Sequence, residues 1–193
     1  FEYSGGYRDR RERDLYGFEQ VRTNQIDTEN GDRLYRYSVQ SYGRNRDYYA
    51  HGLVTSEYLY TADGKKLQGA VYDYDLKTLA VGNNTTDAVV FPALKTLVQS
   101  NFDEASGDSL AVAVSNTYDD YGNLQGYKET TTGYSLEADI NYHKIADKYI
   151  VGVPSHITVS SGGKTYRERS TKVDGNGEIT EIMLHNGDKP SVY

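Results

Sequence analysis

Hydrophobic and polar residues alternate along most of the chain, in short stretches that are separated by turn residues. Alternation with a period of two is typical of a strand that has one drier face and one wetter face. The pattern predicts strands over residues 15–25, 33–42, 53–60, 66–74, 91–102, 108–118, 123–132, 155–159, 164–172 and 178–184. The stretch 91–102 also fits a short helix, but a strand is the preferred interpretation.

Glycine-bearing turns lie between many of these stretches and predict antiparallel hairpins. The four clearest are Asp63-Gly64, Asp119 to Asn123, Ser160 to Gly163 and Asp174 to Gly177. Helix is scarce, because only residues 142–149 could form a turn or two before a glycine and a proline end them. The sequence therefore predicts an all-β protein built from stacked antiparallel hairpins.

A weak repeat links three of these turns, each with a strand, a glycine turn and a returning strand. Such a repeat is typical of proteins that add one hairpin after another to a long sheet. The candidate turn positions are Asp63, Gly64, Tyr118, Asp119, Gly122, Asn123, Asp174 and Gly177. We expect Gly122 to have a positive φ, a conformation that is costly for residues with a β-carbon.

The composition is dominated by 20 tyrosines, with no cysteine, no tryptophan and one methionine. A net charge of -7 argues against nucleic acid or an anionic membrane as the main partner. No apolar run reaches the length of a membrane span, and the lack of cysteine excludes disulfides. No break in composition marks a boundary, so residues 1–193 are predicted to be one β region. A possible subdivision is a lead-in segment, 1–50, and a set of hairpins, 51–193.

Two groups of residues could bind a ligand. The tyrosines could stack on sugar rings, but their spread over the whole chain favours cross-strand packing. Asp174, Asn176 and Glu178 alternate like the start of a calcium loop. An EF-hand loop needs glycine at its sixth position and glutamate at its twelfth, where this chain has Ile179 and His185. Turn chemistry explains the segment without a metal.

Catalytic and metal-binding motifs are not evident. The four histidines, His51, His143, His156 and His185, lie far apart in the sequence and lack zinc-site spacing. No Gly-x-Ser-x-Gly segment presents a serine nucleophile. The charges of residues 8–14 alternate in sign, which favours a solvated, internally paired segment. The sequence thus predicts no catalytic residue, no cofactor and no metal ligand.

Two segments resemble known proteins. The segment from Tyr118 to Leu124 (Tyr-Asp-Asp-Tyr-Gly-Asn-Leu) resembles the YD repeat of Rhs/YD-repeat proteins, and the turns at Asp63-Gly64 and Asp174 to Gly177 resemble degenerate copies. Residues 11–21 are similar to the Glu-Arg-x-x-x-Gly-Phe segment of insecticidal toxin-complex B-type subunits. In that group a loop-rich region precedes the YD repeats, which is also the order found here.

The resemblance implies an extended, curved sheet that spirals into a hollow shell around a toxin or other cargo. It implies a non-enzymatic fragment of a larger, secreted or surface-exposed bacterial protein. Its partners would be other repeats of the same parent chain and an enclosed effector polypeptide. The aspartate motif with which the family's core cleaves itself is absent, and so is a variable C-terminal effector, so cargo release and toxicity are not carried over.

Two alternatives belong to other functional classes. One is a carbohydrate-binding β module of a surface protein, for which exposed tyrosines clustered in a groove would be evidence. The other is an enzyme such as a glycosidase, which needs a pair of carboxylates close together in space. For the shell fragment we expect an unfinished sheet edge, which either contacts other copies or is covered by the segment Phe1 to Tyr7.

Overall fold

The computed structural model describes residues 1–83, 86–186 and 189–192 of the chain. Over these residues it contains thirteen strands and one short 3-10 helix, η1. The elements are β1 (Glu2–Ser4), β2 (Gln20–Asp27), β3 (Arg33–Ser41), β4 (Ser56–Thr61), β5 (Lys66–Ala80), β6 (Val89–Phe102), β7 (Ser109–Tyr118), β8 (Leu124–Thr131), β9 (Tyr134–Tyr142), η1 (Ala146–Lys148), β10 (Pro154–Ser161), β11 (Lys164–Val173), β12 (Ile179–Asn186) and β13 (Lys189–Val192).

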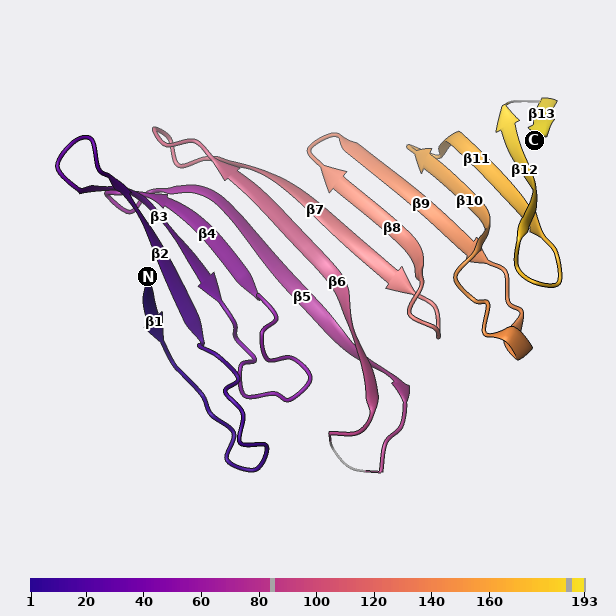
Figure 1. Ribbon diagram of the computed structural model, residues 1–193. Coiled ribbons are helices and arrows are strands. Elements are labelled where there is room, and N and C mark those ends of the chain that lie inside the picture. The colour runs from indigo at the N-terminus through magenta and orange to yellow at the C-terminus, as the bar shows by residue number, and fades with distance from the viewer. Residues whose placement is uncertain (84–85, 187–188, 193) are drawn as a thin grey trace. The chain divides into compact units, whose positions relative to one another are not determined.

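The strands follow one another in the sheet in the same order as in the chain (Figure 1). Neighbouring strands run antiparallel, as the registers of β2 with β3, of β5 with β6 and of β10 with β11 show. The predicted all-β fold with antiparallel hairpins is therefore confirmed. No helix in the described part of the chain is long and apolar enough to cross a membrane.

The chain divides into two compact units, which we call unit 1 (Phe1–Ala113) and unit 2 (Val114–Tyr193). The predicted subdivision into a lead-in segment, 1–50, and hairpins, 51–193, stays a prediction.

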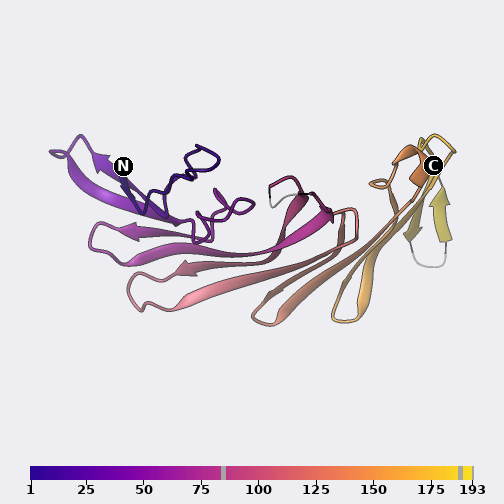
Figure 2. The same cartoon turned by 90° about the horizontal axis from the view of Figure 1, so that it is seen from below.

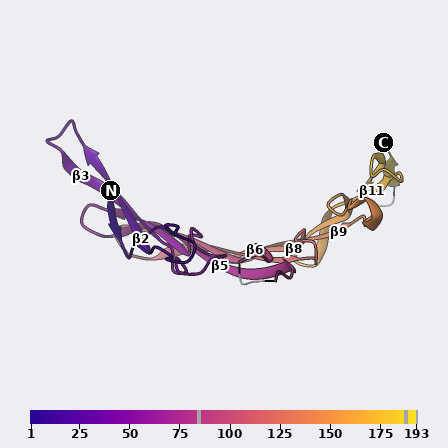
Figure 3. The same ribbon diagram turned by 60° about the horizontal axis from the view of Figure 1, so that its bottom comes forward.

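Unit 1 is built around the long hairpin of β5 and β6, and its strands lie in one layer (Figure 3). Along β5 the side chains of Ala70 and Tyr72 are buried and half-buried, whereas those of the alternating residues Val71 and Asp73 are exposed. This alternation gives β5 one drier face and one wetter face. At the edge of β2, Glu2–Ser4 pairs with residues 20–22, so the segment Phe1 to Tyr7 covers part of that edge, as predicted for one of the two outcomes.

Unit 2 consists of hairpins joined by short turns, except for one longer connection. Residues 143–153 join β9 to β10, include η1, and lie beside the turn that connects β11 to β12 (Figure 2). We call residues 143–153 the joining loop. The hairpin of β10 and β11 turns at Gly162 and Gly163, both with positive φ, as a two-residue loop between paired Ser161 and Lys164 requires.

Neither unit has a large hydrophobic core among its described residues. The buried hydrophobic side chains there are Tyr16, Ala50, Ala70, Ala93 and Val151. Many large apolar or aromatic side chains are exposed on the strands, for example Tyr35 at 62% and Tyr166 at 65%. The strands are therefore held mainly by the backbone ladder and by cross-strand side-chain pairs, each of which contributes about 0.2–1 kcal/mol.

Three expectations about the strands need correction. The strand predicted over residues 15–25 begins only at Gln20, because Gly17 has a φ of +86° and Leu15 forms only an isolated bridge with Arg8. The strand β9 was not predicted at all. Residues 142–149 are helical only over η1, and Tyr142 belongs to β9. The preferred interpretation of residues 91–102 as a strand is confirmed by β6.

Candidate functional site

The turn between β7 and β8 contains the clearest of the predicted positions. The amide of Gly122 donates a hydrogen bond to the carbonyl of Asp119 at 3.2 Å, and the amide of Asp119 donates to the carbonyl of Asn123 at 2.9 Å. Gly122 has a φ of +86°, as expected. These bonds match a three-residue hairpin loop, in which a type I turn is followed by a left-handed residue, usually glycine.

The side chain of Asp119 completes this turn. Its Oδ1 accepts hydrogen bonds from the amides of Tyr121 (2.9 Å) and Asn123 (3.0 Å), and its Oδ2 accepts one from Nδ2 of Asn123 (3.1 Å). Burial opposes the ionisation of Asp119, but these hydrogen bonds and nearby Lys144 hold the pKa of its carboxyl below its usual value. An aspartate is therefore favoured here because a short carboxylate reaches two turn amides at once.

Tyr118 is the last residue of β7 and directly precedes this turn. Its side chain is half-buried, and burial raises the pKa of its hydroxyl. It thus packs as part of the sheet, whereas Asp119 belongs to the turn.

The turn between β11 and β12 repeats the same device. The amide of Gly177, with a φ of +83°, donates to the carbonyl of Asp174 at 3.1 Å. Oδ1 of Asp174 accepts hydrogen bonds from the amides of Asn176 (2.8 Å) and Glu178 (3.0 Å). These two bonds hold the pKa of the Asp174 carboxyl below its usual value. Two turns of unit 2 therefore share the same backbone hydrogen bonds and the same two amide-to-carboxylate bonds.

The turn between β4 and β5 in unit 1 has the same backbone bonds but a different first residue. The amide of Gly64 donates to the carbonyl of Thr61 at 3.1 Å, and Oγ1 of Thr61 accepts from the amide of Lys65 at 3.0 Å. Thr61, not Asp63, thus takes the place of Asp119. Asp63 lies two residues later, and its carboxylate accepts a hydrogen bond from Thr61 Oγ1 at 2.5 Å.

The joining loop connects the two turns of unit 2. Nδ2 of Asn123 donates to the carbonyl of Val151 at 2.8 Å, and Nζ of Lys148 donates to the carbonyl of Gly175 at 2.6 Å. The structure therefore brings the predicted positions 119–123 and 174–177 to one loop. We call this arrangement of the joining loop and both turns the turn clamp.

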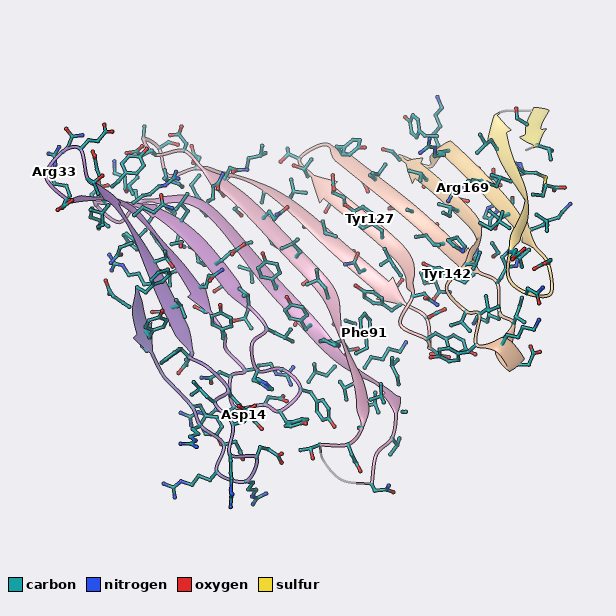
Figure 4. All side chains as sticks on the ribbon, viewed as in Figure 1. Asp14, Arg33, Phe91, Tyr127, Tyr142 and Arg169 are labelled. Atoms are coloured by element: carbon teal, nitrogen blue, oxygen red, sulfur yellow. The ribbon has the colours of Figure 1, made fainter. Side chains whose placement is uncertain are left out.

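Side-chain packing tightens the turn clamp. A β-carbon built on Gly177 would lie 2.7 Å from Cδ1 of Ile150, so the loop side chain rests directly on this glycine. The ring of Tyr149 meets that of Tyr121 edge-on at 6.4 Å. Tyr142, which projects from β9, donates its hydroxyl to the carbonyl of Leu124 at 2.8 Å (Figure 4).

The chemistry available to the turn clamp is structural. Its polar groups are paired with one another, and within the described residues no three histidine, aspartate or glutamate side chains surround a metal position. The clamp fixes the hairpin turns of β7–β8 and β11–β12 relative to the strand connection between them. Both turns could be predicted from their glycines. No role could be predicted for residues 143–153, because their hydrogen-bond partners lie 27 and 28 positions away in the sequence.

The tyrosines of unit 1 form a ladder across neighbouring strands. The rings of Tyr37 on β3 and Tyr60 on β4 are stacked at 4.9 Å, and the two residues are paired in register. The guanidinium of Arg22 lies 3.8 Å from the centre of the Tyr37 ring, and Nζ of Lys66 lies 4.4 Å from that of Tyr58. These rings are occupied by cross-strand and cation–π contacts.

Comparison with known proteins links this architecture to toxin complexes. No family model and no curated protein matches the sequence. The crystal structure of TcdB2-TccC3-Cdc42 matches the fold with a TM-score of 0.72 at 9% identity, over 95% of this chain and 15% of that chain. The crystal structure of TcdB2-TccC3 without its hypervariable C-terminal region matches with a TM-score of 0.73, at the same identity and coverage.

At this identity the likeness concerns the fold alone, and this chain spans 15% of the length of those chains. The matched structures are toxin complexes of the Rhs/YD type. The fold thus agrees with the resemblance that the YD-like turns and residues 11–21 indicate.

Proposed function

We propose that the chain is a structural wall segment of a Rhs/YD-type shell that encloses a toxin or other cargo polypeptide. The observation that carries the proposal is the fold match, which covers 95% of this chain but only 15% of a much longer toxin-complex chain. A segment of this kind acts by enclosure and needs no catalytic group. In this proposal the parent protein is secreted. The segment contacts other repeats of the same parent chain and the enclosed cargo polypeptide.

The small hydrophobic core supports a role as part of a larger assembly. Among the described residues, the buried apolar side chains of unit 1 are Tyr16 and three alanines, and that of unit 2 is Val151. A domain of this length that folds alone ordinarily buries about two-thirds of its surface around a core. A wall segment instead obtains part of its stability from the repeats that continue its sheet.

The repeated turn supports the same proposal. Each glycine turn lets one strand return beside the previous one with a short loop, so hairpins can be added without limit. The turn clamp of unit 2 then holds two of these turns against the joining loop. This is what a continuous wall requires and what a ligand site does not.

The carbohydrate-binding module is the weaker alternative. Exposed tyrosines are distributed over β1, β3, the connection between β3 and β4, β9, the joining loop and β11. A shallow hollow of about 460 Å³ does adjoin Tyr37 and Tyr60. However, Arg22 covers the face of the Tyr37 ring that a sugar would need.

A protease-protection experiment on the longer parent protein tests the proposal. We expect the cargo polypeptide to resist proteinase K inside the intact parent protein and to be degraded quickly when expressed alone. Gly177→Ala in the turn clamp should expose the cargo, whereas the control Asp73→Asn, at an exposed strand position, should not. Equal degradation of the cargo inside the parent and alone would overturn the proposal.

A further inference from the structure

Two histidines that are far apart in the sequence lie on one face of unit 2. His156 belongs to β10 and His185 to β12, with β11 between them. Their ring centres are 6.3 Å apart. The absence of zinc-site spacing in the sequence therefore does not describe their arrangement in space.

Both rings direct a nitrogen at the same hydroxyl group. Oγ of Ser170 on β11 lies 2.8 Å from Nε2 of His185 and 3.3 Å from Nδ1 of His156. Ser170 is paired in register with His156, so the backbone fixes this proximity. Two imidazole nitrogens that converge on one point are also the arrangement that binds a transition-metal ion.

The second nitrogen of His156 already has the partners typical of a metal ligand. Nε2 of His156 lies 3.0 Å from Oγ1 of Thr158 and 3.4 Å from Oε1 of Glu168. Metal-binding histidines usually donate their other ring N–H to a carboxylate or another acceptor, which fixes the tautomer. The side chains of His156 and Glu168 are 35% and 37% exposed, so an ion from solution can reach them.

A serine hydrolase is the other chemistry that a Ser–His contact suggests, and the strand geometry disfavours it. A serine nucleophile needs backbone amides directed at the developing oxyanion. The residues around Ser170 pair with β10 on one side and with β12 on the other. Their amides are therefore committed to the ladder.

We propose that His156 and His185 form a site for a divalent transition-metal ion, with Cu²⁺ bound most tightly. Imidazole suits Cu²⁺, Ni²⁺ and Zn²⁺, and affinity for such ligands is highest for Cu²⁺. The nitrogens need to approach the ion to about 2.0–2.1 Å, which small rotations of two partly exposed rings allow. Within the described residues no third histidine or carboxylate completes the site, so water and the Ser170 hydroxyl supply the other ligands.

Titration of the full chain with Cu²⁺ or Ni²⁺ alone, followed by calorimetry, tests this site. We expect one ion per chain, with the affinity reduced at least tenfold in His156→Gln and in His185→Gln. Glu168→Gln should reduce the affinity by about tenfold, because it acts through His156. His51→Gln is the matched control, since its ring is stacked on Tyr16 in unit 1.

Circular dichroism and the melting temperature of each variant without metal separate loss of the site from loss of the fold. The proposal is overturned if the double variant His156→Gln/His185→Gln, still folded, binds Cu²⁺ as tightly as the unmodified chain. It is equally overturned if His51→Gln loses as much affinity as His185→Gln. In either case the pair serves only as a hydrogen-bond link between β10, β11 and β12.

Discussion

The turns 119–123 and 174–178 of unit 2 share their backbone hydrogen bonds and two amide-to-carboxylate bonds but have different surroundings. In the first, the Asp119 side chain is buried, and Asn123 ties the turn to the carbonyl of Val151. In the second, Asp174 is only half-buried, and the loop reaches the turn through the charged end of Lys148. The local sequence therefore determines the shape of each turn, whereas the joining loop determines how strongly it is held.

This comparison separates two contributions to the stability of each turn: the bonds within the turn, and its contacts with the joining loop. The positive φ of the glycine and the bonds from turn amides to the side chain of the first residue are local, so they recur in all three turns, with Thr61 in the place of the aspartate in one of them. Contacts with the joining loop are particular to one copy and involve residues far away in sequence. Substitutions at matched positions of the turns can therefore measure the second contribution against the first.

The largest effect is expected from Gly177→Ala. A β-carbon there has to adopt a φ of +83° and also meets Cδ1 of Ile150 at 2.7 Å. Strain costs about 1–2 kcal/mol and overpacking about 1–3 kcal/mol more, so the free energy of unfolding should fall by about 3 kcal/mol. Gly64→Ala, with a φ of +87° but its nearest contact at 3.6 Å, should lose only the first part.

Urea unfolding of both glycine variants gives the two free energies. The added cost in Gly177→Ala should diminish when Ile150 is also changed to alanine, which a double-mutant cycle detects. Equal losses in Gly177→Ala and Gly64→Ala would show that the joining loop does not rest on the turn.

A smaller difference is expected between Asp119→Ala and Asp174→Ala. Either change leaves two turn amides without their carboxylate partner. At buried Asp119 those amides are poorly solvated and the loss should be about 2 kcal/mol, whereas around Asp174 water replaces the carboxylate and the loss should be about 1 kcal/mol. Chemical denaturation gives the free energy of unfolding of both variants. A larger loss for Asp174→Ala than for Asp119→Ala would contradict the stronger hold on the first turn.

Most of the hairpins could be predicted because their signals are local. Glycines that need positive φ, such as Gly122 and Gly177, are visible in the sequence, and so are the aspartates that begin their turns. The role of Thr61 in the turn between β4 and β5 was harder to predict, because Asp63 beside Gly64 looks like the YD aspartate. Only the hydrogen bonds show that Thr61 takes that place.

The remaining features depend on long-range pairing. The strand β9 has many polar residues and follows a two-residue turn at Gly133, so neither its alternation nor its turn was distinctive. The contact of Lys148 with Gly175 spans two strands of sequence. The approach of His156 to His185 depends on the register of three strands, which a single sequence does not specify.

The smallest expected effect is on the loss of stability at acidic pH. Hydrogen bonds hold the carboxyl pKa of both Asp119 and Asp174 below the usual value in the folded state. Their stabilisation is therefore complete above the unfolded value of about 3.9 and is lost as the pH falls through the lower folded values. Melting temperatures between pH 5 and pH 2 should fall less steeply in Asp119→Asn than in the unmodified chain. An unchanged slope would show that the carboxylate charge does not stabilise this turn.

Hydrogen exchange at the sheet edge tests the wall-segment account most directly. β1 covers only residues 20–22 of β2, which leaves residues 23–27 open on that side. We expect those amides of residues 23–27 that do not donate to β3 to exchange quickly in this chain alone and at least tenfold more slowly in the longer parent protein, where another repeat pairs with them. Amides of β4, which lies between two strands, should exchange alike in both. Equally fast exchange of residues 23–27 in the chain and in the parent would contradict the account and favour a self-contained module.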